Sequence, residues 1–370
     1  MSEFNKTQMY TDGHMTAVHP GTHIRDFIEV GLYSQKELAI RMCISEKKLS
    51  ELINGKCELN PELQVKIAIA TGTKVSQWKR LNDGFHRDLA EIRLKQQLKK
   101  EKQMLREVNY QYWVEQGIME ETDDDREKVL NLRRYLEINS LQLLKSRYFL
   151  VQYKATGDIN DEKHILNSNA WVQTAVNVGK KIQTEDINLK GLREVIPEVK
   201  ELTNENIEKS LPKLKELFAK NGIEFVILPP LKDSGIHGAV KWVNDRIVLL
   251  ALADDFTYED EFWMVLLHEI KHVLQAKKGH IIVASDDKDI DSVLDLAKLE
   301  KEADDYANKV LMSKAKYNRF VEQKDFSKVA VIKFADQIEI KPGLVVNRLQ
   351  RNGLIGKDEL NDLRIKYVRN

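Results

Sequence analysis

Apolar and polar positions alternate along the chain with two different periods. Between Pro20 and about residue 217, apolar residues recur every three or four positions, which is typical of amphipathic helices. The first of these predicted helices span residues 21–28, 34–42 and 45–54. After Gly222 the pattern changes to short apolar runs, at 223–228, 238–242 and 246–250, which predict strands. The chain is therefore predicted to be a multidomain α+β protein with a small sheet in its second half.

The helix predicted around residues 265–274 is apolar on nearly every side, yet it carries two histidines and a glutamate. His268 and His272 are four residues apart, so both imidazoles lie on one face and can reach a single tetrahedral cation. Glu269 would then lie beside that cation, where it can take a proton from a metal-bound water and pass it to a leaving amine. The alternative is a pair of core histidines that bond to backbone carbonyls.

A second helix, predicted over residues 296–312, offers a third ligand. Glu300 and Asp304 fall on its apolar stripe, beside small residues that leave room for another helix. We interpret Glu300 as a metal ligand, because a catalytic zinc takes three protein ligands and keeps one position open for water. Asp304 lies one turn further on and is predicted to hold a ligand histidine by its other ring nitrogen. Alternatively, Glu300 and Glu302 belong to a solvated charged face.

These two segments resemble the signature of the ImmA/IrrE family of metallopeptidases. The matching residues are His268-Glu269-Ile270-Lys271-His272, Glu300 to Ala307, and Val310 to Ser313. The resemblance implies a gluzincin-like α+β peptidase domain that binds Zn²⁺, with Mn²⁺ possible at two histidines and a carboxylate. It also implies a DNA-bound repressor as substrate, and a sheet edge that binds the peptide as an added strand. Two departures are visible, since Lys271 replaces a small residue and Ser313 replaces a proline.

Near the N-terminus, two short predicted helices are joined by a tight turn. Ser34 and Glu37 form a capping box, and Ser45 begins the next helix after three residues or fewer. This spacing predicts a helix-turn-helix whose second helix faces a major groove. The stretch resembles the Xre-type DNA-binding domain of HigA-like antitoxins. The segments that carry this resemblance are His19-Pro20-Gly21, Ser34 to Ala39, Leu52 to Lys56 and Thr71 to Trp78.

If the resemblance holds, six polar residues are the expected DNA contacts. They are Lys47, Lys48 and Ser50 on the recognition helix, and Gln35, Lys36 and Lys56 toward phosphates. Leu49, Leu52 and Ile53 are expected to pack inward. Cys43 stands in the turn where this family often has glycine, and a left-handed backbone there would cost on the order of 1 kcal/mol. The alternative is a helical bundle used for dimerisation, with its lysines merely solvated.

Composition limits the choice of cellular setting and partners. The chain has 370 residues, of which 42% are hydrophobic and 31% charged, and its formal net charge is zero. A zero net charge argues against a general polyanion binder but allows a local basic face. Cys43 and Cys57 are the two cysteines, and we find no secretory leader and no apolar run near 20 residues. We therefore expect a cytoplasmic protein with no membrane span and no disulfide.

Five segments make up the predicted organisation. They are a flexible N-terminus (1–13), the helix-turn-helix domain (14–95), a helical linker or middle domain (96–217), the zinc peptidase-like domain (218–320) and a C-terminal helical extension (321–370). Residues 120–125 are acidic and predict a loop, Pro197 and Pro212 predict helix breaks, and no internal repeat is expected. We expect a homodimer, because operators read by such domains are commonly two-fold.

Two functions fit these patterns. The first is a bacterial or phage-type DNA-binding regulator with a zinc metallo-endopeptidase domain that cleaves a repressor or regulator protein, either this chain or another. The second is a HigA-like antitoxin that represses its own operon and neutralises a small partner toxin, with a structural or inactive metal site.

Overall fold

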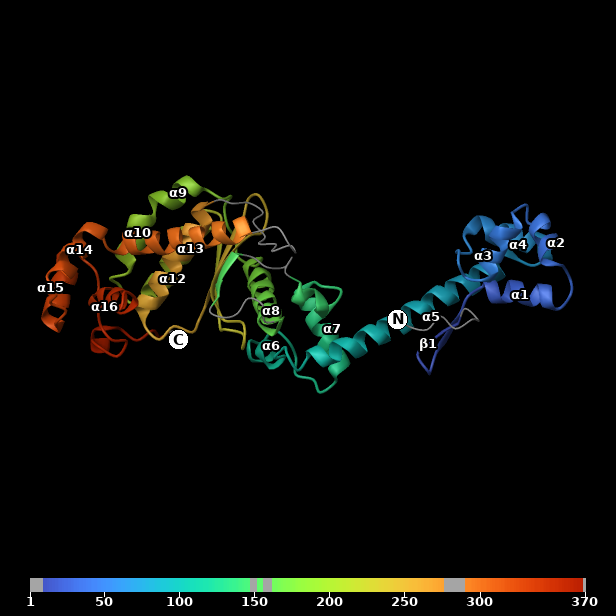
Figure 1. The fold of residues 1–370 in the computed structure, drawn as a ribbon, viewed down its shortest axis with the longest axis horizontal. Helices are drawn as coiled ribbons and strands as arrows, with labels where there is room; N and C mark the ends of the chain where they lie inside the picture. Colours follow the sequence, from blue (N-terminus) through green and yellow to red (C-terminus); the bar gives the residue numbers. More distant parts are fainter. Residues whose placement is uncertain (1–8, 147–151, 156–161, 276–289, 369–370) are drawn as a thin grey trace. The chain divides into compact units, whose positions relative to one another are not determined.

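The computed structural model describes residues 9–146, 152–155, 162–275 and 290–368. They form two compact units, Met1–Gln103 and Met104–Asn370. The chain is mostly helical with small sheets (Figure 1), so the prediction of an α+β protein is confirmed at that level. Among the described residues, no helix combines the length and apolar character needed to cross a membrane.

The first unit begins with a hairpin, β1 (Met9–Thr11) and β2 (Thr16–Val18), where a flexible terminus was predicted. Residues 1–8 of that predicted segment lie outside the described residues. Five helices follow: α1 (Gly21–Glu29), α2 (Gln35–Arg41), α3 (Glu46–Ile53), α4 (Pro61–Thr71) and α5 (Val75–Met104). The hairpin packs on α5 because the buried Ala17 meets the apolar side chain of Phe85.

Helices α2 and α3 and the short turn between them lie where the helix-turn-helix was predicted. Ser34 Oγ accepts a hydrogen bond from the Glu37 amide, and Ser45 Oγ accepts one from the Lys48 amide, both at 3.1 Å. These bonds cap the two helices and set their first turns. Cys43 has a φ of 52°, so the turn does use a left-handed residue. The predicted inward positions, Leu49, Leu52 and Ile53, are buried.

The second unit begins with six helices and a 3-10 turn. They are α6 (Gln111–Glu115), α7 (Asp125–Leu136), η1 (Leu141–Lys145), α8 (Glu162–Gly179), α9 (Leu189–Glu194), α10 (Ile196–Leu202) and α11 (Ile207–Ala219). Residues 120–124, most of the predicted acidic loop, lie between α6 and α7, and Asp124 caps α7. Pro197 lies in the first turn of α10. The break predicted at Pro212 is wrong, since α11 continues through it while Leu214 and Phe218 pack into the core.

The sheet of this unit has four strands in the order β3-β5-β6-β4, rather than the three expected. Its members are β3 (Gln152–Ala155), β4 (Ile223–Leu228), β5 (Ile236–Trp242) and β6 (Val248–Ala253). β4 and β6 run parallel, and the other pairs are antiparallel. β3 pairs with β5 between Ile236 and Val240. A peptide therefore cannot add to this edge of β5 as an extra strand while β3 is in place. β6 begins two residues later than predicted, at Val248.

Two helices cover opposite faces of this sheet. Glu224 on β4, Leu249 on β6 and Lys241 on β5 are in register and share the face that α8 covers. Gly238 lies three residues before Lys241, so it belongs to the other face, which is covered by α12 (Glu259–Gln275). The alternation of side chains along β5 therefore brings Gly238 under the helix that carries the two histidines.

The remaining elements are α13 (Ile290–Leu311), α14 (Lys314–Glu322), α15 (Lys328–Gln337), α16 (Pro342–Arg351) and η3 (Asn361–Leu363). α13 packs alongside α12 (Figure 1). One apolar core extends along the chain from Leu192 to Leu349. This core includes residues on both sides of positions 217/218 and 320/321, where domain boundaries were predicted. The two boundaries remain predictions.

The turn between α15 and α16 repeats the backbone of the turn between α2 and α3, which the sequence analysis missed. Glu339 has a φ of 59° and takes the place of Cys43. The Ile340 amide bonds to the Ala335 carbonyl at 3.2 Å, as the Ile44 amide bonds to the Ala39 carbonyl at 3.1 Å. The surroundings differ, because α16 is buried along most of its length and packs on α12. The helix after this second turn therefore leaves less of its surface exposed than α3 does.

Candidate metal centre

Helices α12 and α13 bring three predicted metal ligands together. His268 Nε2 lies 3.0 Å from His272 Nε2 and 3.1 Å from Glu300 Oε2, and His272 Nε2 lies 3.2 Å from Glu300 Oε1. The two histidines are buried, and the Glu300 side chain is 30% exposed. Around a zinc ion with bonds of about 2.0–2.1 Å, tetrahedral geometry separates neighbouring donor atoms by about 3.3 Å. The two imidazole nitrogens and the two carboxylate oxygens of Glu300 are therefore spaced close to what a zinc site requires.

The outer nitrogens of both imidazoles show why a cation fits here. His268 Nδ1 lies 3.0 Å from Asp304 Oδ1, and His272 Nδ1 lies 2.9 Å from Gln275 Oε1. Since both partners are oxygen acceptors, each Nδ1 carries the proton in the neutral ring and each Nε2 presents a lone pair. Two lone pairs and the Glu300 carboxylate then point at one another. These electron-rich groups repel one another, and a metal ion bound between them would be coordinated by all of them.

The ionisation of the cluster follows from the same contacts. When the two imidazoles are protonated, their Nε2–H groups donate hydrogen bonds to Glu300; burial would raise the pKa of this carboxyl, but these hydrogen bonds outweigh it and lower that pKa to about 2. Burial would lower the pKa of His272, but the hydrogen bond to Glu300 and the charges of Glu269 and Glu300 raise it overall. The carboxylate is therefore ionised at neutral pH, as a metal ligand must be.

Glu269, the predicted general base, is completely buried between α12 and the sheet. Gly238 on β5 makes room for it, because a Cβ at that position would lie 2.6 Å from Glu269 Oε1 and 2.8 Å from its Cδ. A side chain at 238 would displace the carboxylate. The glycine therefore decides where the Glu269 carboxylate lies, and the sequence analysis assigned it no such role.

Three more residues complete the surroundings of the metal ligands. Asp304 lies against His268, as predicted, and its Oδ1 also accepts a hydrogen bond from Arg351 at 3.3 Å. Gln275 was not predicted, although its position three residues after His272 puts it on the same helical face. Its Nε2 also donates to the Leu299 carbonyl on α13 at 3.3 Å. Arg351 had no sequence signal, because it lies on α16, 47 residues after Asp304.

The two departures from the signature, Lys271 and Ser313, have different surroundings. The Lys271 ammonium lies 3.9 Å from Glu302 on α13 and 5.9 Å from the centre of the Tyr306 ring. Lys271 is thus turned toward α13. Ser313 takes the N-cap position of α14 and makes no side-chain cap hydrogen bond.

The six predicted DNA contacts all lie in the first unit. Lys47 and Lys48 are exposed on α3, and Lys36 and Lys56 are exposed before and after it. Gln35 is half-buried at the start of α2. Ser50 is also half-buried, and its hydroxyl accepts a hydrogen bond from Asn54 at 3.3 Å. Four of the six predicted contacts are therefore open to a ligand.

No model of a protein family and no curated protein matches this sequence, and no solved structure matches its fold. The assignment of a function therefore depends on the chemistry of the site itself.

Proposed function

We propose that this chain is a DNA-binding regulator with a zinc-dependent metallo-endopeptidase site, and that it cleaves a repressor or regulator protein, including itself. One observation carries the proposal. Three donor atoms from His268, His272 and Glu300 lie within 4.8 Å of one another beside the buried carboxylate of Glu269. Two imidazoles and one carboxylate, with a fourth position left for water, are the ligand set of catalytic zinc sites.

Each residue has a separate role in the proposed hydrolysis. His268, His272 and Glu300 would hold the zinc, which when bound acts as a Lewis acid toward water and the peptide carbonyl. Glu269 accepts the proton of the attacking water and delivers it to the leaving amine. Asp304 and Gln275 hold the imidazoles in the tautomer that leaves Nε2 unprotonated. The dry surroundings of Glu269 strengthen its interaction with charge that develops in the transition state.

The helix-turn-helix of the first unit supplies the proposed DNA-binding half. The lysines of α3 are exposed, and Ser34 and Ser45 cap the first turns of α2 and α3. We propose an operator duplex as the ligand, a homodimer as the binding form, and the bacterial cytoplasm as the setting. Replacing Lys36 and Lys56 with alanine should reduce the slope of log affinity against log salt by about two, one for each proposed phosphate contact.

A comparison of Glu269→Gln with the parent chain tests the enzymatic proposal. The full chain, loaded with zinc, is incubated alone and with a mixture of quenched fluorescent peptides, and cleavage is followed by fluorescence and mass spectrometry. We expect Glu269→Gln to bind zinc and lose hydrolysis, while Glu302→Gln, its control on α13, keeps both. Hydrolysis that is unchanged in Glu269→Gln contradicts the proposal. A zinc-loaded parent chain that binds an operator duplex and cleaves nothing would instead support the antitoxin class.

A further inference from the structure

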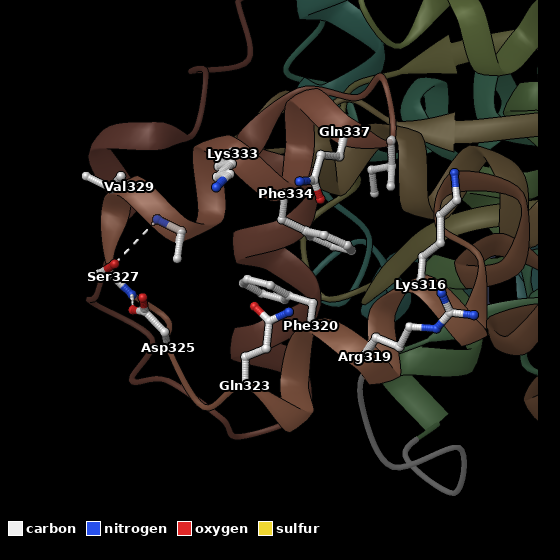
Figure 2. A pocket seen from close by; sticks show the side chains of 12 residues that line it. Lys316, Arg319, Phe320, Gln323, Asp325, Ser327, Val329, Lys333, Phe334 and Gln337 are labelled. Atoms are coloured by element: carbon white, nitrogen blue, oxygen red, sulfur yellow. Dashed lines mark hydrogen bonds between the residues drawn. The ribbon is translucent and has the colours of Figure 1, made fainter.

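A groove of about 580 Å³ lies between α14 and α15, away from the residues of the metal centre. Figure 2 shows the rings of Phe320 and Phe334 facing each other at its floor. Their centroids are 4.3 Å apart and the planes are within 4° of parallel. Both rings are at least nine-tenths buried, so they close the floor of the groove and leave no slot between them for a flat ligand.

The rim of this groove is positively charged. Lys316 and Arg319 come from α14, and Lys333 comes from α15 on the other side of the stacked rings (Figure 2). Within the described part of the chain, none of these three side chains makes an ion pair, although Lys328 nearby pairs with Asp362. Asp325 is the acid of the lining, and its carboxylate accepts the Ser327 amide at 3.0 Å. The lining of this groove thus has three cations and one carboxylate, a positive excess in a chain of zero net charge.

The polar and apolar lining favours a peptide over a nucleic acid. Gln323 and Gln337 line the groove with amides, which can both donate to and accept from a peptide backbone. Val329 is 75% exposed at the rim and offers an apolar contact. DNA recognition is disfavoured because α16, the second helix of this helix-turn-helix, is buried against α12. The exposed Val329 and the nearby cations are complementary to a peptide segment that carries acidic side chains and an apolar side chain.

We propose that the groove between α14 and α15 binds an acidic peptide segment of a partner protein. Glutamates or aspartates of the segment pair with Lys316, Arg319 and Lys333, and an apolar side chain between them packs on Val329. This binding requires neither zinc nor hydrolysis, so it stands apart from the proposed peptidase activity. It would place a partner protein on the same unit that carries the metal centre.

Fluorescence anisotropy tests the proposal with two labelled peptides. One has glutamates on both sides of a central Leu-Phe pair, and the other has glutamine in place of every glutamate. The full chain is used with and without zinc. We expect only the acidic peptide to bind, and binding to weaken by about tenfold or more when Arg319→Glu and Lys333→Glu are combined. Lys314→Glu, on α14 but outside the groove lining, is the matched control and should keep the affinity.

Three outcomes overturn the proposal. The first is no binding of the acidic peptide by a folded parent chain. The second is equal weakening by Lys314→Glu, which means a diffuse electrostatic attraction rather than a groove. The third is displacement of the peptide by a mixed-sequence DNA duplex whose own binding is lost with Arg319→Glu and Lys333→Glu, which assigns the groove to nucleic acid. Circular dichroism of each variant establishes that the charge changes leave the fold intact.

Discussion

His268 on α12 and Asp304 on α13 are joined through the ring nitrogen that faces away from the metal position, with Nδ1 and Oδ1 3.0 Å apart. The same carboxylate oxygen accepts a hydrogen bond from Arg351 on α16. A ligand histidine is thereby tied to a helix of the C-terminal segment. Such contacts fix the orientation of the ring and raise the basicity of the ligand nitrogen.

Loss of the Asp304 carboxylate should weaken metal binding. In Asp304→Ala the His268 ring loses its acceptor, and we expect zinc affinity to fall about 10- to 100-fold, as is common when such partners are removed. Competition with a chromophoric chelator measures this directly. Asp305→Ala removes the exposed neighbouring carboxylate and should change nothing. Arg351→Ala should cause a smaller loss, because its side chain is 39% exposed and water can replace it. Equal affinities in Asp304→Ala and Asp305→Ala would show that the contact has no role in holding the metal.

A methyl group at position 238 should separate metal binding from catalysis. Gly238→Ala places a Cβ 2.6 Å from Glu269 Oε1, so the carboxylate must move, while His268 and His272 keep their helix positions. Misplacing a catalytic group by about 1 Å can cost about 100-fold in rate, and we expect kcat to fall by about that factor. Zinc content by elemental analysis should be unchanged. Full activity in Gly238→Ala would mean that Glu269 does not act from its position above β5.

The turn between α2 and α3 should be stabilised by glycine. Cys43 has a φ of 52°, and a left-handed residue with a Cβ costs about 1–2 kcal/mol relative to the favoured conformation. Glycine also gives the unfolded chain more conformational entropy, which reduces this stabilisation by about 0.4–1 kcal/mol. We therefore expect Cys43→Gly to raise the free energy of unfolding by about 0.5 kcal/mol, measured with urea. Cys43→Ala keeps the Cβ and should give no such gain in the free energy of unfolding. An equal gain in both variants would mean that loss of the thiol, and not the left-handed backbone, causes the stabilisation.

Glu224 should make the second unit less stable as the pH rises. Burial raises the pKa of this carboxyl, and the charge of Lys180 lowers it by less. Because the folded-state pKa exceeds the ordinary value of 4.5, the native state loses stability as the pH rises from that value through the folded pKa. Glu224→Gln should therefore raise the melting temperature at pH 8 and have little effect at pH 4. Glu216→Gln is the control of opposite sign, since the Lys220 hydrogen bond lowers the pKa of Glu216. A gain in Glu224→Gln that is the same at both pH values would contradict this account.

The sequence predicted those parts of the site that lie on single helices. His268, Glu269 and His272 follow from helical spacing, and Glu300 and Asp304 from a polar interruption of an apolar stripe. Gly238 and Arg351 were missed because they reach the site through the sheet and through α16, and local periodicity contains no information on such long-range packing. β3 was missed for the same reason, since its strand conformation depends on pairing with β5.

The repeated helix-turn-helix shows a second limit of the sequence. Cys43 and Glu339 take the same left-handed position in the two turns, yet neither is the glycine that would signal it. Of the two second helices, α3 exposes its lysines and α16 is buried. The apolar pattern predicted α3, and α16 lies in the predicted C-terminal helical extension, but the sequence did not show which of the two helices packs on another element.

The metal content of Glu300→Ala, beside that of Glu302→Ala and the parent chain, tests the central claim most directly. The two glutamates lie two residues apart on α13, but only Glu300 contacts the two histidines, and Glu302 lies near Lys271. Elemental analysis of protein purified without chelator should find about one zinc per chain in the parent and in Glu302→Ala, and none in Glu300→Ala. A parent chain without metal, or a Glu300→Ala chain that keeps it, would contradict the proposed metal centre.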